Sequence, residues 1–160
     1  MLRPPEPLDA SHSLEAFSSG VPSLDDWLKR RARTNHASGA SRTYVVADEG
    51  NRVVGYYALA SGALASSEAP GRLRRNMPDP IPMAVLGRLA IDSDHQGQGV
   101  GVALLRDAVL RVRQASSILG IRGLLVHAIS EDAKAFYEHH GFTAGVNAPM
   151  TLVLSLAGDI

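Results

Sequence analysis

A glycine-rich segment, Gln96-Gly97-Gln98-Gly99-Val100-Gly101, constrains the fold of this chain more than any other stretch. The mostly apolar run Met83–Ile91 precedes it and predicts a strand, and apolar residues from Leu104 to Ala115 recur on one face of a long predicted helix. Free N–H groups at the start of such a helix point toward an anion, and glycines let a phosphate approach the main chain. The order strand, loop, helix therefore predicts a phosphate-binding loop.

The spacing of the glycines excludes two common phosphate-binding loops. A dinucleotide-binding fingerprint needs a third glycine where Val102 stands, and a P-loop needs Gly-Lys-Ser or Gly-Lys-Thr, which does not follow. The remaining candidate is a ligand that carries phosphate but is neither a dinucleotide nor a nucleoside triphosphate. A purely structural turn is the alternative, because glycine-rich loops are common between elements.

The rest of the chain predicts strands that alternate with helices. The hydrophobic pattern predicts mainly helical structure over residues 8–42, with Ser23 as the N-cap of a second helix. We further expect antiparallel strands over Thr43–Ala47 and Val53–Ala60, an irregular proline-rich connection over 61–82, strands over Met83–Ile91, Leu124–Ile129 and Thr151–Leu156, and a helix over Glu131–His140 ended by Gly141. This order predicts one α/β (α+β) domain over residues 1–160, with a mixed sheet flanked by helices.

Composition excludes several classes of protein. The chain has 160 residues and no cysteine, which excludes a disulfide framework, thiolate zinc sites and a cysteine nucleophile. The histidines lack metal-ligand spacing, so we expect no metal. The chain has no secretory signal and no run of about 18 apolar residues, so we expect a cytoplasmic protein that does not bind membranes.

The formal net charge of +0 conceals a segregated charge distribution. Between Lys29 and Arg42 there are five basic residues and no acidic one, and residues 27–88 hold ten basic residues against four acidic ones. Such a stripe suits a phosphate backbone. The alternative is a solvated helix face followed by an exposed basic loop.

The motifs resemble those of one enzyme family. Gln96–Gly101 matches the Q/R-x-x-G-x-G/A motif of the GCN5-related N-acetyltransferases, abbreviated GNAT, and Ala133–Tyr137 with Gly141-Phe142 is similar to the family's A-x-x-x-Y and G-F elements. The segments from Phe17 to Val45, with residues 86–92 and 125–128, resemble the acetyltransferase toxins of bacterial toxin–antitoxin pairs. The resemblance covers nearly the whole chain.

The resemblance implies a GNAT fold and acetyl-CoA as cosubstrate. It implies that the glycine loop and the preceding strand bind acetyl-CoA through Leu89, Ala90, Ile91, Gln96, Gly97, Gln98, Gly99, Val100 and Gly101. Tyr137 becomes the catalytic proton donor to the CoA thiolate, because a phenol with a pKa of about 10 is protonated at neutral pH. Ser130 stands where many members have Asn, and we leave it out of the predicted site.

The toxin resemblance further implies an acceptor and partners. The expected reaction acetylates the α-amine of aminoacyl-tRNA and blocks translation, with tRNA contacts from Lys29, Arg30, Arg31, Arg33, Arg74, Arg75 and Arg88. No carboxylate falls in a recognisable base position, so we expect direct attack by an amine that is already largely neutral. A ribbon-helix-helix antitoxin with co-repressor function and a homodimer are also implied. The alternatives are an acetyltransferase of a small amine or a protein N-terminus, and a CoA-binding or antitoxin-binding module without turnover.

Overall fold

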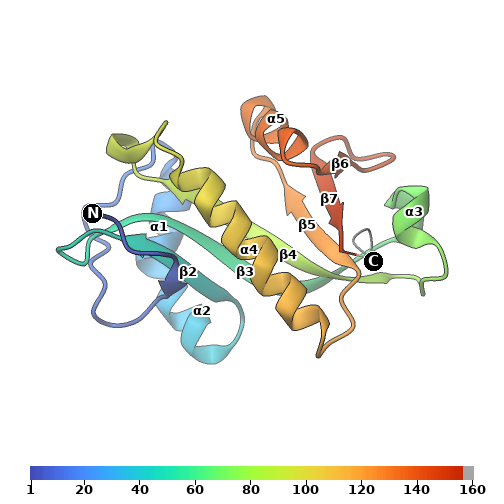
Figure 1. The fold of residues 1–160 in the computed structure, drawn as a ribbon, viewed down its shortest axis with the longest axis horizontal. Helices are drawn as coiled ribbons and strands as arrows, with labels where there is room; N and C mark the ends of the chain where they lie inside the picture. The colour runs from blue at the N-terminus through green and yellow to red at the C-terminus, as the bar shows by residue number, and fades with distance from the viewer. Residues whose placement is uncertain (157–160) are drawn as a thin grey trace. The chain divides into compact units, whose positions relative to one another are not determined.

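The β-branched and apolar segments of the chain form a mixed seven-stranded sheet in the computed structural model, which describes residues 1–156 (Figure 1). The strand order is β1-β2-β3-β4-β5-β7-β6. The elements are β1 (Glu6–Pro7), α1 (Pro22–Arg30), α2 (Ala32–Ser38), β2 (Arg42–Ala47), β3 (Val53–Leu64), η1 (Ser66–Glu68), α3 (Gly71–Arg74), β4 (Ile81–Ile91), η2 (Ser93–His95), α4 (Val100–Ser116), β5 (Gly123–His127), α5 (Glu131–His139), β6 (Thr143–Ala144) and β7 (Thr151–Ser155). The predicted sheet flanked by helices is confirmed.

The chain groups into two compact units, one of residues 1–60 and 87–109 and one of residues 61–86 and the chain from Leu110 onward. In the first unit β2 and β3 form the predicted antiparallel hairpin, with Tyr44 opposite Tyr57. The turn is fixed by Asp48, whose Oδ1 accepts the N–H groups of Gly50 at 2.9 Å and Arg52 at 3.0 Å. The hairpin prediction therefore holds, since Asp and Asn side chains stabilise such turns locally.

The core of the first unit centres on Tyr56 of β3. Its ring lies edge-on to Phe17 and stacks on Trp27, with centroid distances of 5.6 and 6.0 Å, and its hydroxyl donates to the Leu24 carbonyl at 2.7 Å. The neighbouring Gly55 faces the opposite side of the strand, where a Cβ would lie 3.0 Å from Leu104 of α4. The two faces of β3 thus pack α1 on one side and the first part of α4 on the other (Figure 1).

The prediction of mainly helical structure over residues 8–42 is wrong for residues 8–21. Leu14 and Phe17 are buried, but this segment follows the sheet: Ser13 N–H donates to the Asn51 carbonyl at 2.8 Å, and Val53 N–H donates to the Ser13 carbonyl at 3.0 Å. The N-cap is also two positions off. Pro22 occupies the first helical position, which its missing N–H permits, so Val21 is the N-cap instead of Ser23.

The second unit contains the parallel pair of the sheet. Residues Met83–Leu86 of β4 pair in parallel with Gly123–Val126 of β5, and β5 pairs antiparallel with β7. The predicted irregular connection over residues 61–82 is wrong in part. It includes the end of β3, η1, α3 and the start of β4, and its Ala69 and Leu73 are almost fully buried.

Candidate active site

The glycine loop is anchored by two side chains that flank it. The Asp92 carboxylate accepts the N–H groups of Ser18 at 2.9 Å and Asp94 at 3.2 Å, which starts the single turn η2. Gln96 Nε2 donates to the carbonyls of Ile91 and Ser19, each at 3.0 Å. The Gln96 side chain therefore ties the loop to β4 and to the segment before α1, and leaves the backbone of the following residues to contact a ligand.

Two glycines in the loop adopt a backbone conformation that other residues avoid. The φ angles of Gly97 and Gly99 are 78° and 83°, in the left-handed region. A Cβ at either position would meet nothing within 4 Å, so the space beside the loop is open. α4 starts directly afterwards at Val100, and the first N–H groups of a helix have no partner within it. The phosphate-binding role of this loop stays a prediction.

The end of β4 offers a second set of backbone donors. β4 continues past its last pair with β5, from Gly87 to Ile91. Asp92 N–H donates to the Val54 carbonyl of β3 at 2.8 Å, and N–H groups of successive residues point to opposite edges of a strand. The N–H groups of Leu89 and Ile91 therefore point away from β3, while the side chain of Ala90 is buried in the core.

Tyr137 lies in α5 of the second unit and is 6% exposed. Its ring packs edge-on against Phe136 and Phe142, with centroid distances of 5.3 and 5.4 Å. Burial raises the pKa of Tyr137 to about 12. Within residues 1–156 the Tyr137 hydroxyl has no hydrogen-bond partner, so its proton is not committed to another group of the described chain.

Ser130 has a structural role at the start of the same helix. Its hydroxyl accepts the Ala133 N–H at 3.1 Å, which makes Ser130 the N-cap of α5. The cap fixes the start of α5, and Tyr137 lies seven residues later on that helix. The absence of Ser130 from the binding site stays a prediction.

The predicted tRNA-contacting residues of the first unit differ in their surroundings. Lys29, Arg30 and Arg31 are exposed at the junction of α1 and α2, where no acidic side chain intervenes. The Arg33 guanidinium instead donates to the His12 carbonyl and so holds the N-terminal segment. Lys29, Arg30 and Arg31 thus form an exposed basic junction, whereas the Arg33 side chain is engaged in a contact within the protein.

Arg88 of β4 makes a contact that the sequence pattern did not reveal. Its guanidinium lies 4.5 Å from the centre of the Trp27 ring, which also stacks on Tyr56. Burial raises the pKa of the Tyr56 phenol above its usual range, the Asp25 carboxylate raises it further, and the Arg88 charge opposes both effects. The contact with Trp27 holds the Arg88 side chain against α1, because the ring electrons of an indole stabilise a guanidinium above it.

Arg74 and Arg75 lie in the second unit, in and directly after the short helix α3, and both are exposed. Two further arginines near them, Arg72 and Arg122, were not among the predicted contact residues. Arg72 belongs to the same basic group in sequence, but nothing in the spacing connects Arg122 with it, since 47 to 50 positions separate Arg122 from these residues.

Residues 1–156 contain no group of three histidine or carboxylate side chains that could hold a metal ion. None of the helices in the same part of the chain is long and apolar enough to cross a membrane. His127 of β5 is exposed, and its Nδ1 lies 3.0 Å from the Thr151 hydroxyl.

The similarity to known proteins identifies the class of this chain as an acetyltransferase. Residues 40–144 match the acetyltransferase (GNAT) domain family. The chain is 50% identical over 150 residues to the tRNA-acetylating toxin of Mycobacterium tuberculosis (strain ATCC 25618 / H37Rv), covering 94% of this chain and 90% of that protein. The chain belongs to the GNAT acetyltransferases, which confirms the predicted fold, family and enzyme class.

Two solved structures are similar over nearly the whole chain. The toxin AtaT complexed with acetyl-methionyl-tRNAfMet matches with a TM-score of 0.90 and 32% identity, covering 97% of this chain and 95% of that one. A Tyr-to-Phe mutant of AtaT, bound to the C-terminus of the antitoxin AtaR and to acetyl-CoA, matches with a TM-score of 0.81 and 32% identity, covering 96% and 92%.

Proposed function

We propose that this chain transfers the acetyl group of acetyl-CoA to the α-amine of aminoacyl-tRNA and thereby blocks translation. The observation that carries the proposal is the 50% identity, over 94% of the chain, with a tRNA-acetylating toxin. The exposed basic junction of Lys29, Arg30 and Arg31 supports it, because a polyanionic acceptor needs such a surface.

The glycine loop fits the pyrophosphate of acetyl-CoA, which supplies an acetyl group activated as a thioester. The left-handed glycines and the open space beside them let the pyrophosphate approach the first N–H groups of α4. The outward N–H groups of Leu89 and Ile91 are placed to bind amide and carbonyl oxygens along the pantetheine arm. A carbonyl oxygen that accepts such an N–H bond is polarised toward attack.

Tyr137 donates a proton to the sulfur as the carbon–sulfur bond breaks. A phenol whose pKa is raised to about 12 is fully protonated at neutral pH, so the donor form is always present. The attacking amine loses one proton as the amide forms, and this proton replaces the one that Tyr137 gives to the thiolate. The reaction therefore leaves the protein unchanged.

The acceptor amine needs little help from a protein base. A free α-amino group has a pKa of about 7.7 to 8.0, and an aminoacyl ester withdraws electrons and lowers it. A substantial fraction of the amine is then neutral at physiological pH. The absence of a carboxylate in a recognisable base position of the sequence agrees with direct attack.

We further propose an antitoxin partner and a homodimer for this chain, acting in the cytoplasm where tRNA is charged. The AtaT structure with the C-terminus of its antitoxin supports a protein antagonist. A ribbon-helix-helix antitoxin would supply DNA contact and make the pair a repressor. A dimer would present the basic junction twice to one tRNA.

The test is incubation with radiolabelled acetyl-CoA and a pool of charged tRNAs, followed by identification of the labelled aminoacyl group. We expect label on the α-amine of one or a few aminoacyl-tRNAs, and none when Tyr137→Phe replaces the natural chain in a short incubation. Label on a polyamine or a peptide N-terminus, with none on tRNA, would show that the acceptor is different. If no acetyl group is transferred to any amine, the protein is a CoA-binding module without turnover.

A further inference from the structure

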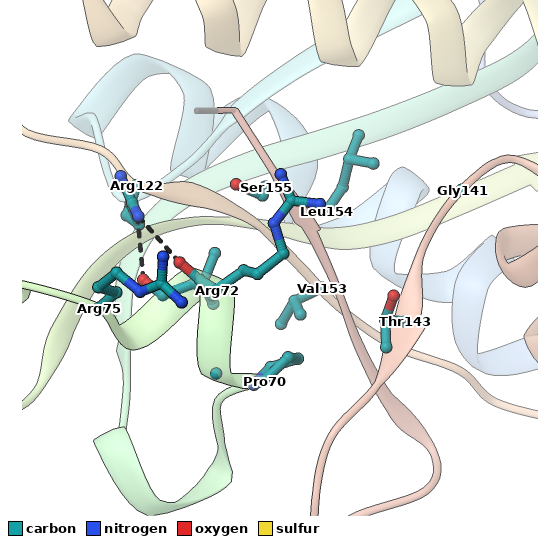
Figure 2. A pocket seen from close by; sticks show the side chains of 11 residues that line it. Pro70, Arg72, Arg75, Arg122, Gly141, Thr143, Val153, Leu154 and Ser155 are labelled. Carbon is teal, nitrogen blue, oxygen red and sulfur yellow. Dashed lines mark hydrogen bonds between the residues drawn. The ribbon is translucent and has the colours of Figure 1, made fainter. Parts of the chain in front are cut away.

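A cavity of about 550 Å³ opens in the second unit (Figure 2). Three arginines line it, namely Arg72, Arg75 and Arg122, together with the hydroxyl-bearing residues Thr143 and Ser155. Leu73, Val153 and Leu154 add apolar surface. None of the described lining residues is acidic. The cavity therefore combines three positive charges with hydrogen-bond donors and a partly apolar wall.

Arg122 is fixed in place before any ligand binds. Its Nε and Nη2 donate to the carbonyls of Leu73 and Arg72, each at 3.0 Å. Its own backbone N–H donates to the Pro82 carbonyl at 2.9 Å. A guanidinium has five N–H donors, so these contacts leave three for a ligand while they hold α3 at the edge of the cavity.

Arg72 and Arg75 carry charges that the described chain does not neutralise. Both side chains are exposed, and neither makes an ion pair or a side-chain hydrogen bond within residues 1–156. Figure 2 shows the Arg72 side chain extending from α3 toward the end of β7, near Ser155 and Leu154. Like charges gathered in one concave site repel one another, and a bound anion removes that repulsion.

We propose that this cavity binds a phosphodiester of the tRNA substrate; the inference rests on the proposed function. Guanidinium groups bind phosphate oxygens in pairs of N–H bonds, and the three arginines supply more donors than a single carboxylate can accept. The cavity volume lies within the range of sites that enclose small organic groups, and the apolar wall suits a ribose.

The test compares Arg72→Gln/Arg75→Gln with Arg52→Gln/Arg106→Gln, a double variant of the same net charge whose exposed arginines lie outside the cavity. Arg122 stays unchanged, because it also holds α3. Binding of tRNA is measured at several salt concentrations. We expect the slope of log affinity against log salt to fall by about 2 for the cavity variant, with a raised KM for aminoacyl-tRNA. The kcat and the KM for acetyl-CoA should not change, and melting temperatures should match.

The outcomes separate this inference from the proposed function. If the natural chain neither binds nor acetylates tRNA, the proposed function fails. If the natural chain acetylates tRNA and the cavity variant keeps the slope of its control, the cavity inference alone is overturned. It is also overturned if the cavity variant keeps tRNA binding but loses binding of an acidic peptide, since the cavity would then serve a protein partner.

Discussion

At the scale of single residues, Tyr137 is the side chain on which the proposed chemistry depends. Tyr137→Phe removes one oxygen that has no hydrogen-bond partner within residues 1–156 and keeps the contacts with Phe136 and Phe142. We therefore expect the free energy of unfolding to change by less than about 1 kcal/mol. The kcat for acetyl transfer should fall by about 10² or more, the usual contribution of a positioned acid, while the KM for acetyl-CoA stays constant.

A matched control is Tyr57→Phe, which also removes a buried phenol oxygen. That hydroxyl donates to the Asp107 carboxylate, so its loss should lower the unfolding free energy by about 1.5 to 3 kcal/mol and leave transfer intact. Steady-state kinetics and denaturant unfolding on both variants give the comparison. Equal rates for Tyr137→Phe and the natural chain would refute the acid role.

The pKa of Tyr137 also predicts the shape of the pH profile. Because burial raises this pKa to about 12, Tyr137 stays protonated from pH 6 to 9.5, and the donor form does not vary. The amine must lose its proton to attack, so kcat/KM should rise with pH through the amine pKa and then level off. The rate is measured with correction for spontaneous deacylation of the tRNA. A falling limb with an apparent pKa of 8 to 9 would mean that another acid donates the proton.

At the scale of elements, the glycine loop gives a prediction about backbone conformation. Gly97→Ala/Gly99→Ala forces alanine into φ angles near 80°, which costs about 1 to 2 kcal/mol per residue in this region. The loop should relax away from its open shape, and the KM for acetyl-CoA should rise by about tenfold or more. The KM for aminoacyl-tRNA should not change. Both constants come from initial rates over a matrix of the two substrates.

The control for this pair is Gly120→Ala. Gly120 also has nothing within 4 Å of a built Cβ, but its φ is not positive, so alanine fits there without strain. An unchanged KM for acetyl-CoA in Gly97→Ala/Gly99→Ala would mean that the left-handed conformation of the loop is not needed for binding.

Element prediction from the sequence succeeded where local chemistry decides the structure. The turn at Asp48 and the left-handed Gly141 that ends α5 were both predicted, because side chain and backbone preferences act within a few residues. The prediction of elements failed where the backbone hydrogen-bond partners of a segment lie far from it in the sequence. Residues 8–21 have helical spacing of apolar residues, yet Ser13 bonds across to the hairpin. The two-residue strands β1 and β6 carry no periodicity to detect.

The candidate site was predictable to a similar extent. The loop and Tyr137 belong to short motifs, so their residues could be named from the sequence. The contact of Arg88 with Trp27 could not, because it requires α1 to lie beside β4, and the sequence does not contain that pairing. Arg122 was missed for the same reason: only the fold brings its guanidinium to the carbonyls of α3.

At the scale of the whole molecule, the distribution of charge matters more than its sum of +0. Arg30 and Arg31 are exposed at the α1–α2 junction and have no side-chain partner within residues 1–156. We expect Arg30→Gln/Arg31→Gln to raise the KM for aminoacyl-tRNA and to lower the salt slope of tRNA binding by about 2, since each phosphate contact contributes about one unit. The net charge changes by the same amount in Arg52→Gln/Arg106→Gln.

This control separates local contact from long-range attraction. If attraction by total charge governed tRNA binding, both double variants would lose the same affinity at every salt concentration, because they have equal net charge. If the junction contacts phosphates directly, only Arg30→Gln/Arg31→Gln loses slope. Equal slopes for the two variants would show that the basic junction is a solvated helix face, and that tRNA is held elsewhere on the protein.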